Sequence, residues 1–119
     1  MANPFVHIEL HSKDVGKSKK FYANLFDWKM EEMPAMGYTI INVGEGTGGG
    51  MMENPMPADS DNWLPYILVD DVRASTQKAT SLGATIAKDV TEVSDMGWFS
   101  VLIDPTGAAF GLWQPKAAM

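Results

Sequence analysis

The chain has 119 residues, no cysteine and a formal net charge of −6 at pH 7. This length suits one domain, and the lack of cysteine excludes disulfides, thiolate metal sites and a cysteine nucleophile. Acidic residues are scattered and no basic stripe or long apolar run occurs, so we expect a cytoplasmic protein that binds neither nucleic acid nor membrane.

The first half of the chain predicts a strand, a helix and three more strands. A strand is expected over 5–11, and Asp14 is placed to cap the helix that follows. The apolar face of this helix contains Val15, Ser18, Tyr22 and Leu25. Further strands are expected over 28–33, 37–43 and 50–53. The glycine-rich run before the last of these lacks the ending and the helix of a phosphate loop, which favours a β-turn.

The second half repeats this order. A strand over 64–69 precedes Asp71, a second expected N-cap, and Gly83 is placed to end the helix. The apolar face of this helix contains Val72, Ser75, Ala79 and Leu82. Strands are then expected over 85–93, 97–103 and 108–114.

The order βαβββ therefore occurs twice, and the two expected helix caps lie 57 positions apart. We predict an α+β fold of curved mixed sheets with flanking helices, in a single domain over 1–119. Module one covers 4–53, a connector 54–63 and module two 64–115. One four-stranded module would leave a sheet face uncovered, so the modules are expected to complete each other within one chain or across a dimer.

Three segments resemble the vicinal oxygen chelate superfamily of glyoxalase I, extradiol dioxygenases and bleomycin resistance proteins. They are VHIEL with DV and FYANLFDW in the first half, YILVDDV with LGA in the second, and the ending DPTGAAFGLWQ. The resemblance spans nearly the whole chain and implies that superfamily's paired βαβββ fold.

The resemblance also implies where a divalent metal would bind: one ligand comes from the first and one from the last strand of each module. The matching positions are His7, Tyr66, Met51 and Gly111. Only His7 is a common ligand type, so we expect neither a metal nor another cofactor. An arrangement of His7 and His11 with Glu9 or Glu53 remains open, although residues four apart on a strand are separated by roughly 13 Å.

The first strand carries a polar row. His7, Glu9 and His11 share one face, which we assign to the concave side, while Ile8 and Leu10 face the helices. His7 and Glu9 are the candidate catalytic residues, as a base and the carboxylate that orients it, or else polar anchors for a ligand. In the alternative, Glu9 and His11 lie in water and His7 is a hydrogen-bonded core residue.

Five residues are the candidate substrate-binding set: His7, Met51, Tyr66, Gly111 and Trp113. On the last strand a glycine and an alanine beside Trp113 leave room for a ligand ring to stack. Alternatively, Trp113 fills a dimer interface or a gap in the core.

These features favour a metal-free protein that binds a small organic molecule in a concave cavity, as the bleomycin resistance branch implies. Two alternatives remain open: a metal-dependent enzyme of the glyoxalase, epimerase or dioxygenase type, and a metal-independent lyase or hydrolase using His7. A homodimer is expected because the superfamily usually pairs modules and four Trp and nine Met suggest apolar surface to bury.

Overall fold

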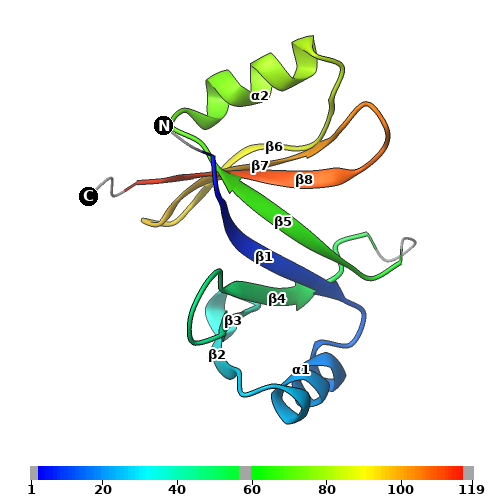
Figure 1. The fold of residues 1–119 in the computed structure, drawn as a ribbon, viewed down its shortest axis with the longest axis vertical. Coiled ribbons are helices and arrows are strands. Elements are labelled where there is room, and N and C mark those ends of the chain that lie inside the picture. The colour runs from blue at the N-terminus through cyan, green and yellow to red at the C-terminus, as the bar shows by residue number, and fades with distance from the viewer. Residues whose placement is uncertain (1–2, 57–59, 117–119) are drawn as a thin grey trace. The chain divides into compact units, whose positions relative to one another are not determined.

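A computed structural model describes residues 3–56 and 60–116 and confirms an α+β fold with two βαβββ modules. The elements are β1 (Phe5–Ser12), α1 (Val15–Leu25), β2 (Lys29–Met33), the 3-10 helix η1 (Pro34–Met36), β3 (Tyr38–Asn42), β4 (Gly49–Glu53), β5 (Asn62–Leu68), α2 (Val72–Ser81), β6 (Thr85–Val93), β7 (Gly97–Ile103) and β8 (Ala109–Pro115). Every predicted helix and strand is present, with bounds shifted by two residues or fewer (Figure 1). Among the described residues, no helix is long and apolar enough to cross a membrane.

The chain divides into two compact units. The first unit is His7–Leu64, and the second unit combines Met1–Val6 with Pro65–Met119. Part of the predicted connector, residues 57–59, lies outside the described residues, and β5 already begins at Asn62.

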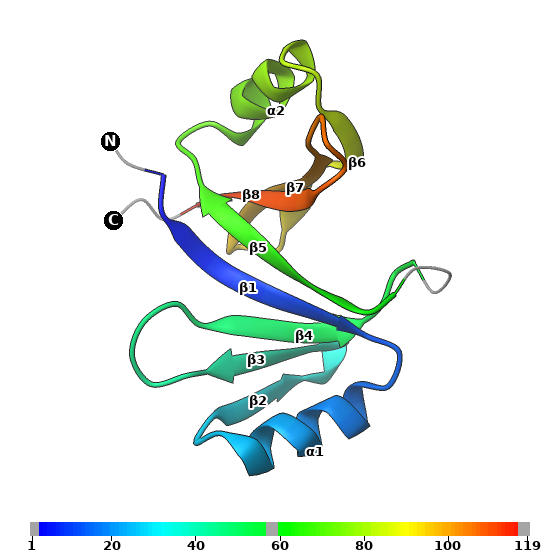
Figure 2. The ribbon, with the colours of Figure 1, turned by 45° about the vertical axis from the view of Figure 1, so that its right-hand side comes forward.

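The first unit contains a four-stranded sheet in the order β2-β3-β4-β1. The pair β1 and β4 is parallel and the other pairs are antiparallel. Helix α1 covers one face of this sheet (Figure 2). Leu10, Ile41 and Met51 form the buried core on that face, with Tyr22 and Trp28 among the side chains packed against them.

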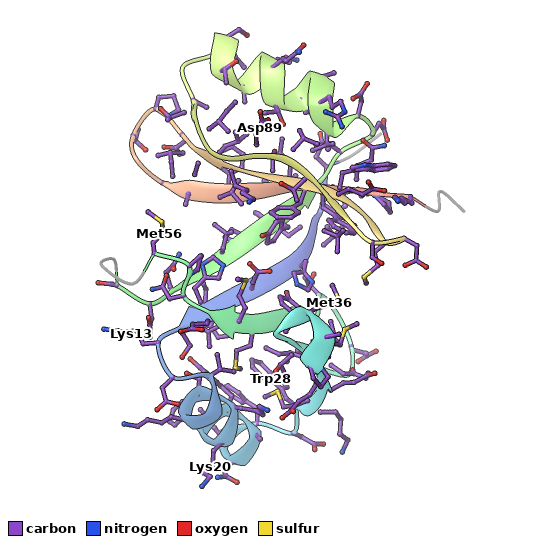
Figure 3. The ribbon with its side chains drawn as sticks, turned by 180° about the vertical axis from the view of Figure 1, so that it is seen from behind. Lys13, Lys20, Trp28, Met36, Met56 and Asp89 are labelled. Carbon is purple, nitrogen blue, oxygen red and sulfur yellow. The ribbon has the colours of Figure 1, made fainter. Side chains whose placement is uncertain are left out.

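Helix α1 begins as predicted, because a carboxylate oxygen of Asp14 accepts from the backbone N–H of Lys17 at 3.0 Å. Its apolar face is only partly covered: Tyr22 packs against the core, but Leu25 is 57% exposed. Figure 3 shows Lys20 projecting outward from α1. The predicted face does contact the sheet, since the Ser18 hydroxyl also lies 2.7 Å from that of Ser12 on β1, and the exception is Leu25, the last residue of the helix.

The second unit repeats the arrangement with the order β5-β8-β7-β6, in which β5 and β8 are parallel. Its core is formed by Val69, Val72, Leu102 and Leu112. Helix α2 ends where predicted, because Gly83 takes the left-handed conformation with φ of 106°, which a residue with a Cβ rarely adopts.

The apolar face predicted for α2 is confirmed at Val72, which is in the buried core, and at Ala79, which packs against it. Leu82, the C-cap residue, is 69% exposed, and Thr76 is buried as well. The Thr76 hydroxyl donates to the backbone carbonyl of Val72 at 2.6 Å and lies 2.9 Å from the hydroxyl of Ser100. A buried polar side chain is tolerated here because its hydrogen bonds are made within the unit.

Strand register gives the equivalent positions of the two modules. Glu9 lies opposite Gly50 on the parallel pair of the first unit, and Tyr66 lies opposite Gly111 on the parallel pair of the second. Glu9 and Tyr66 are 57 positions apart, like the two helix caps, so Glu9 and not His7 is the counterpart of Tyr66, and Gly50 is the counterpart of Gly111.

Candidate functional site

A chain of hydrogen bonds runs along the β1 face opposite α1. The Nε2 atom of His7 is 2.7 Å from the Tyr38 hydroxyl oxygen, and that hydroxyl donates to Oε1 of Glu9 at 2.8 Å. The other carboxylate oxygen of Glu9 is 2.7 Å from Nε2 of His11. The structure thus joins three predicted polar residues into one network through a tyrosine on β3.

Glu9 is the centre of this network. It is 8% exposed, so burial alone would raise its pKa, but hydrogen bonds from His11 and Tyr38 and the electrostatic attraction of the two imidazoles outweigh burial and hold the pKa below its ordinary value. The carboxylate is therefore ionised at neutral pH. The expectation that Glu9 and His11 lie in water is wrong, because both side chains are mostly buried against each other.

His7 is neutral at the same pH. Desolvation by burial lowers its pKa, and the nearby charge of Glu9 only partly opposes this. Since the Tyr38 hydroxyl gives its hydrogen to Glu9, its oxygen accepts from Nε2–H of His7. The network therefore assigns the His7 proton to Nε2 and the ring lone pair to Nδ1.

Tyr38 is the site residue that sequence reasoning missed. Its ring lies directly over Gly50: a Cβ built on Gly50 would be 1.9 Å from the Tyr38 hydroxyl oxygen and 2.2 Å from the adjacent ring carbon. A glycine inside a strand signals close approach of another group, and Gly50 is the sequence feature that could have indicated it.

The register also corrects one predicted binding residue. Met51 pairs with Leu10 and is fully buried in the core on the α1 side, whereas Glu9 pairs with Gly50 on the opposite face. Gly50, not Met51, is thus the module-one counterpart of Gly111. Gly50 and Gly111 are 61 positions apart, so the prediction of Met51 was one residue off, which places its side chain on the other face of the sheet.

In the second unit, Tyr66 occupies the space predicted above Gly111. A Cβ on Gly111 would be 2.4 Å from two carbons of the Tyr66 ring, and Tyr66 also meets Phe99 edge to face at 6.2 Å between ring centres. Trp113 lies opposite Phe99 in the sheet register and is partly exposed. The gap that Gly111 was expected to leave for a ligand ring is therefore filled by the protein.

The residues at the metal positions implied by the superfamily do not fit a divalent ion. The last strands contribute glycine at both paired positions, Gly50 and Gly111, and glycine has no side-chain donor. Across residues 3–56 and 60–116, no group of three or more His, Asp or Glu side chains is arranged to hold an ion.

Comparison with known proteins agrees with the superfamily that the sequence motifs resemble. A sequence model described as "Bleomycin resistance protein-like N-terminal" matches residues 4–44. "Putative glyoxylase CFP32" of Mycobacterium bovis is 35% identical over 86 residues, which cover 72% of this chain and 33% of that protein. The chain belongs to the vicinal oxygen chelate superfamily. It spans about a third of the length of this curated relative.

Solved structures of low sequence identity share the superfamily fold with this chain. The hypothetical protein BH1468 of Bacillus halodurans has a TM-score of 0.74 at 17% identity, covering 100% of this chain and 99% of that one. Methylmalonyl-CoA epimerase of Streptomyces coelicolor, in complex with 2-nitronate-propionyl-CoA, has a TM-score of 0.69 at 14% identity, covering 98% and 100%. At these identities the likeness concerns the fold alone.

Proposed function

We propose that this superfamily member binds a small organic molecule, without a metal, on the sheet face that carries His7, Glu9 and Tyr38. The observation that supports this is the ionised, nearly buried Glu9, held between a tyrosine hydroxyl and an imidazole. Burying a carboxylate on a sheet is costly unless donors surround it. A site of this kind recognises a ligand that presents a hydroxyl, amide or ammonium hydrogen to the network.

The same geometry supports a second function, a metal-independent lyase or hydrolase. His7 is neutral and its tautomer is fixed by Tyr38, so it retains a basic nitrogen at neutral pH. Glu9, through Tyr38, orients the imidazole and stabilises the positive charge that His7 acquires when it takes a proton. His7 and Glu9 are then the base and its positioning residue, as the sequence predicted.

A thermal-shift screen of small polar aromatic compounds, followed by calorimetry on the best binder, tests the binding proposal. Replacing Glu9 with Gln or Tyr38 with Phe should weaken binding about 10-fold or more, since a hydrogen bond to a charged group contributes about 1.5–3 kcal/mol. Glu45→Gln and Tyr22→Phe remove an exposed carboxylate and a hydroxyl on the helix side, and should leave the affinity unchanged. Equal binding by all four variants would contradict the proposed site.

Trp113, Tyr66 and Gly111 belong to the corresponding face of the second unit, and the same screen tests the binding role predicted for them. Trp113→Ala should weaken the selected binder if its ring takes part. An unchanged dissociation constant would contradict a binding role for Trp113.

Elemental analysis of protein purified without chelator tests the absence of a metal. We expect substoichiometric Ni²⁺ and Zn²⁺ and no hemithioacetal isomerisation when either ion is added. A stoichiometric ion, or turnover that requires the ion and is abolished by His7→Ala, would overturn the metal-free proposal and favour a glyoxalase-type enzyme.

A further inference from the structure

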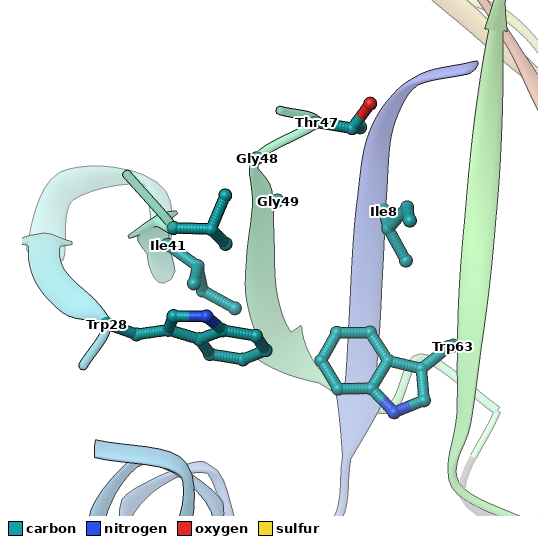
Figure 4. A pocket seen from close by; sticks show the side chains of 8 residues that line it. Ile8, Trp28, Ile41, Thr47, Gly48, Gly49 and Trp63 are labelled. Carbon is teal, nitrogen blue, oxygen red and sulfur yellow. The ribbon is translucent and has the colours of Figure 1, made fainter. Parts of the chain in front are cut away.

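An apolar pocket lies on the α1 side of the first unit's sheet, the face opposite the His7–Glu9 network. It has a volume of ≈ 240 Å³ and is separate from the His7–Glu9 network. Trp28 and Trp63 lie on opposite sides of it (Figure 4). The remaining lining residues are Ile8, Ile41, Val43, Thr47, Gly48 and Gly49. Thr47 is the only one of these with a hydroxyl, so the pocket wall is almost entirely hydrocarbon and indole.

The internal repeat explains why this pocket exists. In the first unit Ile41 pairs with Gly49, and in the second unit Leu102 pairs with Phe110 at the equivalent position. The Phe110 side chain packs against the core cluster that contains Leu102. The first unit has a glycine where the second has a phenylalanine, so the place of one benzyl side chain is left open.

The chain cannot fill this place from Gly49. A Cβ there would be 2.0 Å from the backbone carbonyl oxygen of Ile8, because β1 and β4 approach too closely for any side chain. The two indoles line the pocket without filling it. Trp63 is 38% exposed, and its ring meets the Tyr22 ring edge to face at 5.5 Å between ring centres. An apolar surface that the protein cannot cover itself is available to an outside group.

We propose that this pocket binds the single aromatic ring of a small apolar molecule, in the place that Phe110 takes in the second unit. An apolar cavity of about 150 Å³ lined by aliphatic and aromatic side chains stays dry and binds benzene. The present pocket holds one ring with a short substituent, and it is smaller than the roughly 300 Å³ at which drug-sized sites begin. Indole edges and faces at its sides favour an aromatic ring over an aliphatic chain of equal size.

Methyl NMR of protein labelled at isoleucine tests this with toluene as the probe. The Ile8 and Ile41 methyl signals should shift in a saturable way, whereas those of Ile67, Ile86 and Ile103, all in the second unit, should not. n-Pentane should bind at least 3-fold more weakly than toluene. Equal shifts at all five of these isoleucines, or no shift up to the solubility limit of toluene, would overturn the proposal.

Two substitutions change the pocket in opposite ways. Trp63→Ala removes one wall and should weaken toluene binding at least 5-fold, while Val43→Phe fills the space and should abolish it. Trp98→Ala, which removes an indole from the second unit, is the matched control and should retain the wild-type affinity. Because Trp63 is partly exposed, its variant keeps the test valid even if Val43→Phe does not fold. Wild-type affinity in Trp63→Ala would contradict the assignment.

The two proposed sites are tested independently. Glu9→Gln should leave toluene binding unchanged, since its carboxylate lies on the other face of the sheet. A further titration with N-acetyl-phenylalanine amide separates a free small molecule from the side chain of a protein partner. Saturable binding of this amide without any response to toluene would overturn the small-molecule proposal in favour of a peptide ligand.

Discussion

At the residue scale, the polar network depends on one glycine. Gly50 lets the Tyr38 ring approach β4 closely, and from there its hydroxyl donates to Glu9. The tyrosine in turn fixes the orientation of His7. A small residue without chemistry of its own therefore decides whether the polar side chains of β1 act together.

Gly50→Ala should destabilise the protein by about 1–3 kcal/mol, the usual cost of inserting a methyl group into filled space. Urea unfolding measures the change. In a Tyr38→Ala background the same substitution should cost much less, because the ring it collides with is gone. Equal costs in both backgrounds would show that Gly50 is required for another reason.

His7 should make stability depend on pH. Its pKa in the folded protein lies below the ordinary value of 6.5, so the unfolded chain binds more protons as the pH falls below 6.5. The stabilisation that His7 gives to the folded state is therefore present in full above pH 6.5, and it is lost as the pH falls toward the folded-state pKa. The Glu9 pKa is also lowered, but from 4.5, so its contribution is lost only at lower pH.

We therefore expect the free energy of unfolding to decrease between pH 7 and pH 5, and to decrease less in His7→Gln. Chemical denaturation at both pH values gives the comparison. The same decrease in the variant and the wild type would show that His7 does not cause it.

At the element scale, both helices use the same start signal but differ in how they are covered. Asp14 and Asp71 each accept from a backbone N–H three residues later, at 3.0 and 3.1 Å. Helix α2 buries Val72 and Thr76, whereas α1 has no buried residue. The N-cap thus specifies where each helix begins, whereas the burial of its side chains depends on how the helix packs against its sheet.

Asp14→Ala and Asp71→Ala should each destabilise the protein by about 1 kcal/mol, as is usual for loss of an N-cap. Asn at either position keeps a side-chain oxygen acceptor and should restore most of the loss. Thermal denaturation of the four variants provides the test, and an alanine variant as stable as wild type would contradict the capping role at that position.

At the scale of the whole molecule, exposed aromatic surface supports the expectation of a homodimer. On and after α1, Phe21 is 58% exposed and Phe26 is 44% exposed, beside the exposed Leu25. At the position of Phe21, 57 residues on, helix α2 has Lys78. Contiguous apolar side chains of this kind often belong to an interface.

Light scattering at micromolar concentration should give twice the chain mass of 13.0 kDa. Replacing Phe21 with Lys, the residue at the matching position of α2, should shift the protein toward monomer if α1 lies in the interface. A wild-type mass of 13.0 kDa would contradict the dimer.

The sequence by itself determined the two βαβββ modules, because caps, glycines and alternating apolar residues act over a few neighbouring positions. It also placed His7, Glu9 and His11 on one face of β1, since alternation along a strand is local. The parts that only tertiary structure decided depend on pairing between strands. Register moved the module-one position from Met51 to Gly50, and it brought Tyr38 to Glu9 across 29 residues. Such contacts follow from how close β3, β4 and β1 pack, and a one-residue change in register moves a side chain to the other face of the sheet.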